Sequence, residues 1–547
     1  MAPARRLRTE LNRELADHKA AIEAKAREYG LDFHETVFEV LDFKTMNQIA
    51  AYGGFPTRYP HWRWGMEFEK LSKRDAYGMG RIYEMVINND PCYAYLQESN
   101  AVIDQKLVMA HVFGHADFFK HNAWFGKTDR KMMNTMANHA VRVQRHMERH
   151  GRETVERFID AALAVEHLID PYSVYAARPS SEGGPGRPGG PAAPPARAAA
   201  PRPEGAGAGE SVDEPDHEEL LGPEGFEPSR YPAKPYMDRF VNPKGELDKQ
   251  RAAHAERRRA AGKSPARPTR DVLLFLMRHA PLAEWQQDVL AIIRAEAYYF
   301  APQAMTKVMN EGWATYWHTK LMTGHFAQAS EIVQYADQHA GVVYMPPGGF
   351  NPYKIGVEMF RDIERRYDRG QHGVEWERLD RLGQKERHDD RSMRGREKIF
   401  EIRRIYNDVA FIDEFLTEEF VERHHMYRYQ RDPATGEVRV VSRDWEQVKR
   451  ELLARLSNMG QPFIYVVDAN YLNRGELYLA HRWTGLDIEL ASAAKVLRHL
   501  RTIWGRPVHC QCRIDDEMYL LSCDDPAEPP KRQRIKDDTP GPAHQVE

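Results

Sequence analysis

The segment MAHVFGH, residues 109–115, places two histidines four residues apart in an apolar stretch. Residues i and i+4 lie on one face of an α-helix, so His111 and His115 can reach the same cation. Much later the chain reads NEGWA, residues 310–314. A carboxylate on a second helix would complete a His, His, Glu ligand set of the kind that holds zinc. Because Zn–N and Zn–O bonds are roughly 2.0–2.2 Å long, we expect His111, His115 and Glu311 to converge within about 5 Å.

The residue after the first histidine distinguishes this chain from common zinc hydrolases. In the H-E-x-x-H motif a glutamate at that position is the general base, whereas this chain has Val112. The sequence therefore predicts the geometry of a metal site without the usual hydrolytic base. Glu296, Glu284 or Glu311 could act as the base instead, provided that it lies within hydrogen-bond reach of the proton it removes.

The third metal ligand is open between several side chains. Glu311 is the first candidate, and His318 lies seven residues later on the same helical face, so either or both can point at the histidine pair. His121 has the third-ligand spacing of metzincins, but those enzymes need a glycine turn where this chain has Phe118. Asp117 points away from the pair if the helix continues, and a surface or helix–helix carboxylate is its simpler interpretation.

Two alternatives limit the metal interpretation. Buried histidines can be core residues that are satisfied by hydrogen bonds alone, and the sequence does not separate this from metal binding. His146 and His150 are also four residues apart, but their surroundings are charged. We therefore predict that this second pair lies on an exposed helix face.

Composition excludes several classes of protein. The 547-residue chain has 78 Lys and Arg against 81 Asp and Glu, a net charge of −3, which argues against non-specific nucleic-acid binding. No apolar run approaches the roughly 18–20 residues that span a bilayer, and the charged start lacks a signal-peptide core. Four cysteines give no disulfide framework. We expect a cytoplasmic protein with no membrane span.

Apolar periodicity and composition divide the chain into five parts. Residues 1–177 and 231–424 are predicted to be mainly helical and carry the histidine pair and Glu311, respectively. Residues 178–230 are rich in Pro, Gly, Ala and acidic side chains and are predicted to be a disordered insert, of which residues 178–209 can be deleted without unfolding the protein. Residues 425–523 repeat a strand–strand–helix pattern, which predicts a small α+β domain with an internal duplication. Residues 524–547 are a polar tail, predicted to be disordered.

Local patterns also predict individual elements. Residues 103–122, 75–88 and 131–168 are predicted to be helices. Ala301-Pro302 is predicted to begin the helix that carries Glu311, because proline is tolerated in a first turn. The fold class expected from the whole pattern is α+β, with the sheet at the C-terminal end.

Longer motifs in the chain resemble one known family. The matching segments are GFPTRYPHWR (54–63), YEMVINNDPCYAYL (83–96), HVFGHADFFK (111–120), IRAEAYYF (293–300), NEGWATYWH (310–318), NPYKIG (351–356), GELYL (475–479) and WGRPV (504–508). In these segments the chain is similar to the SpoVR-like family, stage V sporulation protein R and its relatives. The resemblance covers nearly the whole chain except the insert and the tail. His121 departs from the family pattern, where an asparagine is usual, and this weakens it as a ligand.

The resemblance implies a cytoplasmic bacterial protein linked to spore formation, particularly to the peptidoglycan cortex, or more widely to envelope stress. It also implies two partners, a PrkA-like serine kinase and a von Willebrand-type protein, because the family is often encoded beside them. Two functional classes remain. One is a scaffold or regulator whose gluzincin-like site is structural or degenerate, which Val112 favours. The other is a zinc-dependent amidase or peptidase, which the histidine pair and Glu311 favour.

Overall fold

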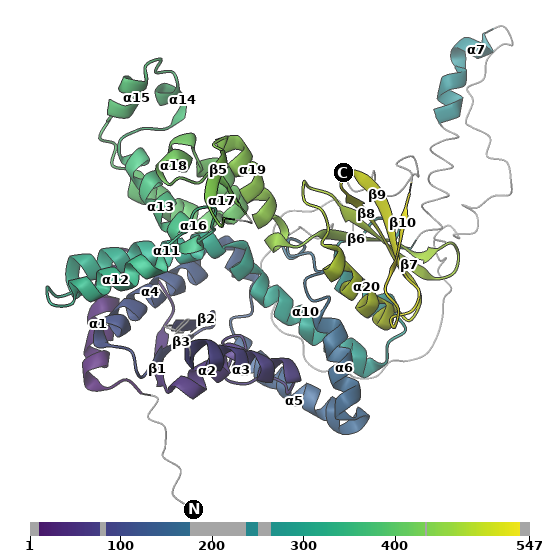
Figure 1. The fold of residues 1–547 in the computed structure, drawn as a ribbon, viewed down its shortest axis with the longest axis horizontal. Coiled ribbons are helices and arrows are strands. Elements are labelled where there is room, and N and C mark those ends of the chain that lie inside the picture. The colour runs from purple at the N-terminus through teal and green to yellow at the C-terminus, as the bar shows by residue number, and fades with distance from the viewer. Residues whose placement is uncertain (1–9, 77–83, 176–236, 250–263, 433–434, 536–547) are drawn as a thin grey trace, which may run out of the picture.

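The structure is a computed structural model that describes residues 10–76, 84–175, 237–249, 264–432 and 435–535. Over these residues the fold is α+β: helices dominate up to residue 423, and a five-stranded sheet lies near the C-terminal end (Figure 1). The predicted insert, 178–230, and the last twelve residues lie outside the described part of the chain. In that part, no helix combines the length and the apolar character needed to cross a membrane.

The N-terminal region contains a small sheet that the sequence pattern did not predict. Its elements are α1 (Arg13–Glu28), β1 (Thr36–Leu41), α2 (Phe43–Ala51), α3 (Trp62–Ala76), β2 (Glu84–Ile87) and β3 (Cys92–Gln97). The strand order is β1-β3-β2, with β1 parallel and β2 antiparallel to β3. The predicted helix over 75–88 is therefore wrong, because β2 pairs with β3 and this tertiary pairing overrides local helical propensity.

Three long helices follow this sheet. They are α4 (Val102–His121), α5 (Met132–His150) and α6 (Arg152–Leu163). The predicted helix over 103–122 is confirmed as α4. The predicted helix over 131–168 is divided into α5 and α6 by Gly151, whose φ of 86° a helix does not allow.

The second helical region supplies the partners of α4. Its longer elements are α9 (Val272–His279), α10 (Glu284–Met305), α11 (Lys307–Leu321), α12 (Ile332–Val342), α13 (Pro352–Asp368), α16 (Gly395–Ile405), α17 (Asp408–Phe415) and α18 (Glu418–Arg423). The predicted helix start at Ala301-Pro302 is wrong, because α10 continues through Pro302 and the break falls at Thr306. The carboxylate of Asp408 accepts hydrogen bonds from the backbone N–H groups of Val308 and Met309, at 2.8 and 2.9 Å, and so caps α11.

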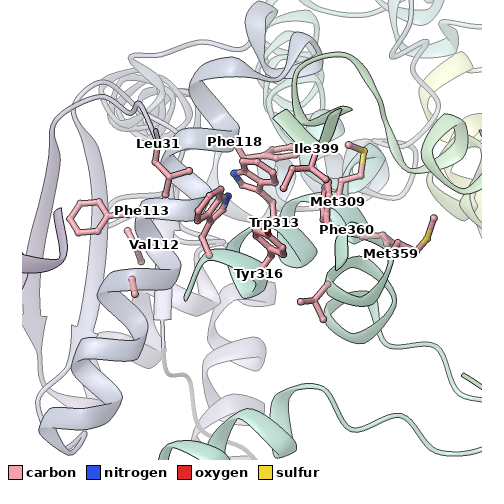
Figure 2. Close-up of a cluster of buried hydrophobic side chains, with 14 of the residues drawn as sticks. Leu31, Val112, Phe113, Phe118, Met309, Trp313, Tyr316, Met359, Phe360 and Ile399 are labelled. Atoms are coloured by element: carbon pink, nitrogen blue, oxygen red, sulfur yellow. The ribbon is translucent and has the colours of Figure 1, made fainter. Parts of the chain in front are cut away.

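Helices α4, α11 and α13 pack with their backbones nearly in contact. A Cβ atom added to Gly114 of α4 would lie 2.7 Å from the Cα atom of Ala314, and one added to Gly312 would lie 2.4 Å from the Cα atom of Gly356 in α13. Figure 2 shows the buried side chains that surround these crossings, including Val112. The close approach fixes how α11 faces α4.

The C-terminal region, predicted to be one α+β domain, contains two separate sheets. Strands β4 (Arg428–Arg431) and β5 (Val438–Ser442) form a separate two-stranded sheet, and α19 (Trp445–Leu456) packs on α17 and α18. The larger sheet contains β6 (Phe463–Tyr471), β7 (Glu476–Arg482), β8 (Val508–Ile514), β9 (Glu517–Cys523) and β10 (Lys531–Arg534), in the order β10-β9-β8-β7-β6, with α20 (Leu490–Trp504) against it. The two strand–strand–helix units therefore do not form one duplicated domain. Strand β10 also gives structure to a segment that was predicted to be a disordered tail.

Candidate metal centre

The candidate metal centre lies where α4 crosses α11. His111 and His115 are 2% and 3% exposed, and both project from the same face of α4 toward Glu311 of α11. The Nε2 atoms of His111 and His115 lie 3.6 and 3.4 Å from Oε2 of Glu311. The candidate ligand atoms of these three residues all lie within 4.8 Å of one another. The convergence expected from the sequence is therefore present.

Both imidazole rings are oriented by partners on α11. Nδ1 of His115 lies 2.9 Å from Oδ1 of Asn310, an acceptor, so Nδ1 donates this hydrogen bond. Nε2, the other ring nitrogen, is then the one that faces Glu311. Nδ1 of His111 lies 2.8 Å from Nδ1 of His318. A second hydrogen bond at the other ring nitrogen is the usual arrangement around metal-binding histidines, since it fixes the tautomer and the direction of the ring.

Charge and burial act in opposite directions on the acidic residue. Burial disfavours ionisation of Glu311, but hydrogen bonds and charge from His111 and His115 outweigh it and hold the pKa of Glu311 well below its ordinary value. Burial and the neighbouring His111 lower the pKa of His318, so this ring is neutral. The arrangement presents an anionic carboxylate oxygen beside two imidazole nitrogens, a donor set that suits zinc.

The distances fit a small tetrahedral ion. Zinc bonds of roughly 2.0–2.2 Å in tetrahedral geometry place neighbouring ligand atoms about 3.3–3.6 Å apart. The separations of Glu311 Oε2 from the two Nε2 atoms, 3.4 and 3.6 Å, lie in this range. The side chain of Glu311 is 18% exposed. Oε2 of Glu311 and Nε2 of His111 are themselves buried. The residues present can therefore hold a zinc ion.

His318 occupies a different place from the other candidate ligands. It is 1% exposed and meets His111 at Nδ1, the nitrogen that does not face Glu311. Its Nε2 atom lies 3.3 Å from Nδ1 of His339 on α12. The structure thus brings His318 to the histidine pair, as the sequence predicted, but behind His111 and not beside the carboxylate.

The alternative bases and ligands do not join this cluster. Both carboxylate oxygens of Glu296 are engaged elsewhere, by Arg58 at 2.6 Å and by Nδ1 of His139 at 3.1 Å. Glu284 is exposed in the first turn of α10. His121 lies at the end of α4, where its Nε2 atom is 2.9 Å from the carbonyl oxygen of Asp32.

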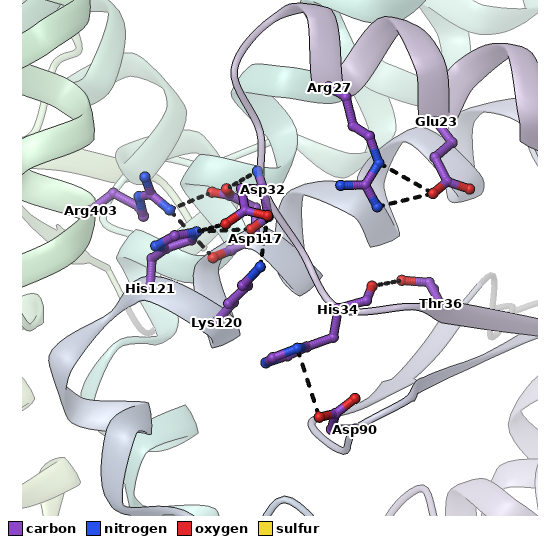
Figure 3. Close-up of polar contacts among 10 residues, drawn as sticks. All are labelled: Glu23, Arg27, Asp32, His34, Thr36, Asp90, Asp117, Lys120, His121 and Arg403. Atoms are coloured by element: carbon purple, nitrogen blue, oxygen red, sulfur yellow. Dashed lines mark hydrogen bonds and ion pairs between the residues drawn. The ribbon is translucent and has the colours of Figure 1, made fainter.

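Asp117 is a helix–helix carboxylate, the simpler of its two interpretations. It is fully buried and accepts hydrogen bonds from Arg403 at 3.0 Å, from the indole of Trp313 at 2.9 Å and from the backbone N–H of Asp32 at 2.8 Å. Figure 3 shows the contacts of Asp117 with Arg403 and Asp32, with His121 beside them. Burial raises the pKa of Asp117 to about 6, although Arg403 opposes the shift. Through Trp313, Asp117 ties α11 to α4.

Sequence reasoning missed Asn310 and the aromatic walls of the site. The rings of Phe119 and Tyr353 stack on His115 and His111, with centroids 5.9 and 6.1 Å apart. Asn310 could have been found from the sequence, because it places a polar amide directly before Glu311 in a mostly buried helix. The sequence pattern gave no comparable signal for Tyr353, because α13 reaches the site through tertiary packing.

Comparison with known proteins defines the class of this molecule. The family model described as "SpoVR like protein" matches residues 10–461, and that described as "SpoVR-like C-terminal domain" matches residues 462–513. The chain therefore belongs to the SpoVR family. It is 28% identical over 529 residues to the "Uncharacterized protein YcgB" of Escherichia coli (strain K12), and the match covers 91% of each chain. No solved structure matches the chain.

Proposed function

We propose that this protein is a zinc-binding scaffold or regulator that acts in the cytoplasm of a bacterium, in spore-cortex formation or the response to envelope stress. The observation that carries the zinc site is the convergence of His111, His115 and Glu311, with spacings that suit a tetrahedral ion. The cellular role follows from the family alone. A PrkA-like serine kinase and a von Willebrand-type protein are the proposed partners on the same ground.

In the part of the chain that the structure describes, no second carboxylate joins the three candidate ligands, and this favours binding over hydrolysis. Val112 is completely buried in the hydrophobic core, where H-E-x-x-H enzymes have their base. Glu296 is held by Arg58 and His139, so its carboxylate already has partners. Within the described residues, the candidate metal group contains a single carboxylate, Glu311, which is needed as the third ligand.

In this proposal each residue has one task. His111, His115 and Glu311 would hold the ion, while Asn310 and His318 orient the two imidazole rings. A bound zinc ion supplies Lewis acidity and a fixed positive charge between the two helices. Because the ligands come from α4 and α11, the ion would cross-link the two halves of the helical body, and its binding energy would add to folding stability.

A zinc-dependent amidase or peptidase is the second candidate. Three protein ligands with one open position are typical of catalytic zinc sites, and structural sites usually have four. Glu311 itself would then have to combine ligand and base roles, or a residue from a partner would have to supply the base.

The first test is elemental analysis of the purified protein, with two matched double variants. We expect about one zinc ion per chain in the wild type and in the variant H146A/H150A, whose histidines are also four residues apart but lie on α5. The variant H111A/H115A should lose the ion and melt at a lower temperature. Equal zinc content in both variants would overturn the proposed site.

The second test separates the two functions. Wild-type protein that is stripped by chelator and refilled with zinc should not cleave an amide bond of a peptidoglycan stem peptide. Val112→Glu, which restores the H-E-x-x-H pattern, is the companion variant. Zinc-dependent cleavage by the wild type would refute the scaffold function, and substitution of Glu296, Glu284 and Glu311 in turn would then identify the base.

A further inference from the structure

A cavity of about 470 Å³ lies where the C-terminal sheet meets the helical body. Its floor is the α20-covered face of the sheet, with Ile464, Leu479 and Cys510, and its roof is α20, with Val496 and Leu500. The cavity also reaches residues 167–168 after α6 and 457–461 after α19. The cavity is thus lined by residues of both family segments, 10–461 and 462–513. Its volume lies in the range of small-molecule sites, which often occur at such junctions.

One polar side chain interrupts the apolar floor. Successive residues of a strand alternate between the two faces of a sheet, and Leu477, Leu479 and His481 of β7 share the face toward α20. Tyr478 and Ala480 belong to a small cluster on the opposite face. His481 therefore occupies a position where the pattern of the strand calls for an apolar residue.

The imidazole of His481 is buried without full hydrogen bonding. The residue is 6% exposed, it lines the cavity, and its Nδ1 atom makes no hydrogen bond. Burial lowers the pKa of His481, so the ring is neutral and can place its proton on either nitrogen. A buried polar atom without a partner is costly, and in native proteins such an atom often marks the place of a ligand or water.

The charged groups of the cavity lie at its exposed mouth. Asp487 already accepts hydrogen bonds from the indole of Trp483 at 2.8 Å and from the backbone N–H of Asp515 at 3.0 Å. Glu489 caps the N-terminus of α20, and Lys495 is exposed on the same helix. The apolar interior therefore offers no buried charge that could neutralise an ionic ligand.

From these features we infer that the cavity is a binding site for an uncharged, mainly apolar small molecule with one hydrogen-bonding group, which pairs with the imidazole of His481. The site is separate from the candidate metal centre, because none of the three candidate ligands lines it. A molecule bound here would contact β6, β7, α20 and the loop after α6 together. Its binding would hold the C-terminal sheet against the helical body.

Nile red, an uncharged aromatic dye with a carbonyl group, is a suitable probe for the full-length protein. Ala493 lines the cavity, whereas the adjacent Ala494 does not, and both are half-buried residues of α20. We expect saturable fluorescence enhancement with the wild type and a loss of affinity of at least about tenfold in Ala493→Trp, which fills the cavity. Ala494→Trp is the matched control and should bind within about twofold of the wild type.

The Nile red affinities of the wild type and the two tryptophan variants show whether the dye binds in the cavity. Absence of saturable dye binding by the wild type, or equal affinity in Ala493→Trp, would overturn the inference. Equal loss in both tryptophan variants would overturn it as well, because binding would then not depend on the cavity. Thermal melts and zinc content of each variant separate these results from unfolding and from failure of the metal site.

The role of His481 needs a second probe without a polar group. In His481→Phe, which keeps an aromatic ring of similar size, Nile red should bind about tenfold more weakly, because one hydrogen bond is lost. Pyrene, which has no hydrogen-bonding group, should bind equally to this variant and to the wild type. Unchanged affinity for Nile red would refute the pairing with the imidazole of His481. Equal weakening for both dyes would indicate altered packing and would also refute it.

Discussion

The orientation of each histidine at the candidate metal centre depends on the ring nitrogen that faces away from Glu311. Asn310 holds Nδ1 of His115, and His318 holds Nδ1 of His111. Both partners lie on α11, the helix that also carries Glu311. One helix therefore supplies both the third candidate ligand and the groups that orient the other two, so small changes on α11 should be measurable as changes in metal affinity.

Asn310→Ala should weaken zinc binding by about 10–100-fold, the usual effect of removing a hydrogen bond that orients a metal ligand. Competition with a chromophoric chelator measures this affinity. Asn310→Asp is the control, because it keeps an acceptor for Nδ1 of His115 and should retain most of the affinity. Wild-type affinity in Asn310→Ala would show that the tautomer of His115 is fixed by another group.

At this scale the sequence predicted the convergent groups better than their surroundings. His111 and His115 follow from helical spacing, and Glu311 from its motif, because these rules are local. The side of His111 that His318 approaches depends on how α11 is rotated against α4, which spacing does not reveal. Spacing also does not reveal the partners of Glu296, because Arg58 and His139 come from distant segments of the chain.

Among the helices, glycine decides how near α11 can come to α4 and α13. Gly114 allows the backbone of α11 to touch α4, and Gly312 allows α13 to touch α11 on the other side. A methyl group at either position would meet backbone atoms, which cannot move aside as a flexible side chain can. The metal geometry therefore depends on residues that carry no chemistry themselves.

Gly114→Ala should destabilise the protein by about 1–3 kcal/mol, because overpacking forces the backbones apart, and should also weaken zinc binding. Gly65→Ala in α3 is the matched control, since its added Cβ would have no neighbour within 4 Å. That control should be neutral or more stable by up to about 1 kcal/mol, as expected for an exposed helical glycine. Thermal melts and zinc titration of both variants test the difference; equal behaviour would contradict the packing argument.

Because Asp408 caps α11, we expect the stability of the folded protein to depend on pH. Burial raises the pKa of Asp408 to about 7, and the hydrogen bonds from Val308 and Met309 only partly oppose this. The pKa of an aspartate in the unfolded chain is about 3.9. The folded protein therefore holds the proton of the Asp408 carboxyl group more tightly than the unfolded chain does. The stabilisation is complete below pH 4 and is lost as the pH rises through 7, a change of roughly 4 kcal/mol at most.

Asp408→Asn removes this titration, because an amide stays neutral at every pH. The melting temperature of the wild type relative to this variant should therefore be higher at pH 5 than at pH 8. Calorimetry at both values gives the comparison. A difference that does not change with pH would show that Asp408 has the same pKa in the folded and unfolded states.

Asp408 also explains why the start of α11 was misplaced by sequence reasoning. Proline at position 302 is a reasonable first-turn signal, but α10 accommodates it and ends at Met305. The cap comes from a residue about one hundred positions later. By contrast, the predicted helix over 103–122 is confirmed, because its apolar periodicity reflects the face that it buries.

The whole molecule is organised around two large cores, and the second core crosses the boundary between the two family segments. It combines apolar side chains of α6, α9 and α10 with those of β6 to β9 and α20. Thr269, just before α9, also pairs with Val466 of β6 through two backbone hydrogen bonds of 2.9 and 2.8 Å. The pattern of strands predicted the sheet, but it did not reveal that α6 packs on α20, the helix that covers the sheet (Figure 1).

This shared core predicts that the two family segments are not independent folding units. A chain that ends at residue 461 would expose the faces of α6, α9 and α10 that now pack on α20 and the sheet. We expect it to bind hydrophobic dyes and to melt at least about 10 °C below the full-length protein, since several kcal/mol of apolar burial are lost. A chain that ends at residue 535 is the control, because it keeps every element from α1 to β10, and its melting temperature should match that of the full chain. If the chain ending at 461 melts cooperatively at the temperature of the full-length protein, the C-terminal sheet is an appended domain, and a ligand in the cavity beside His481 could not stabilise the helical body.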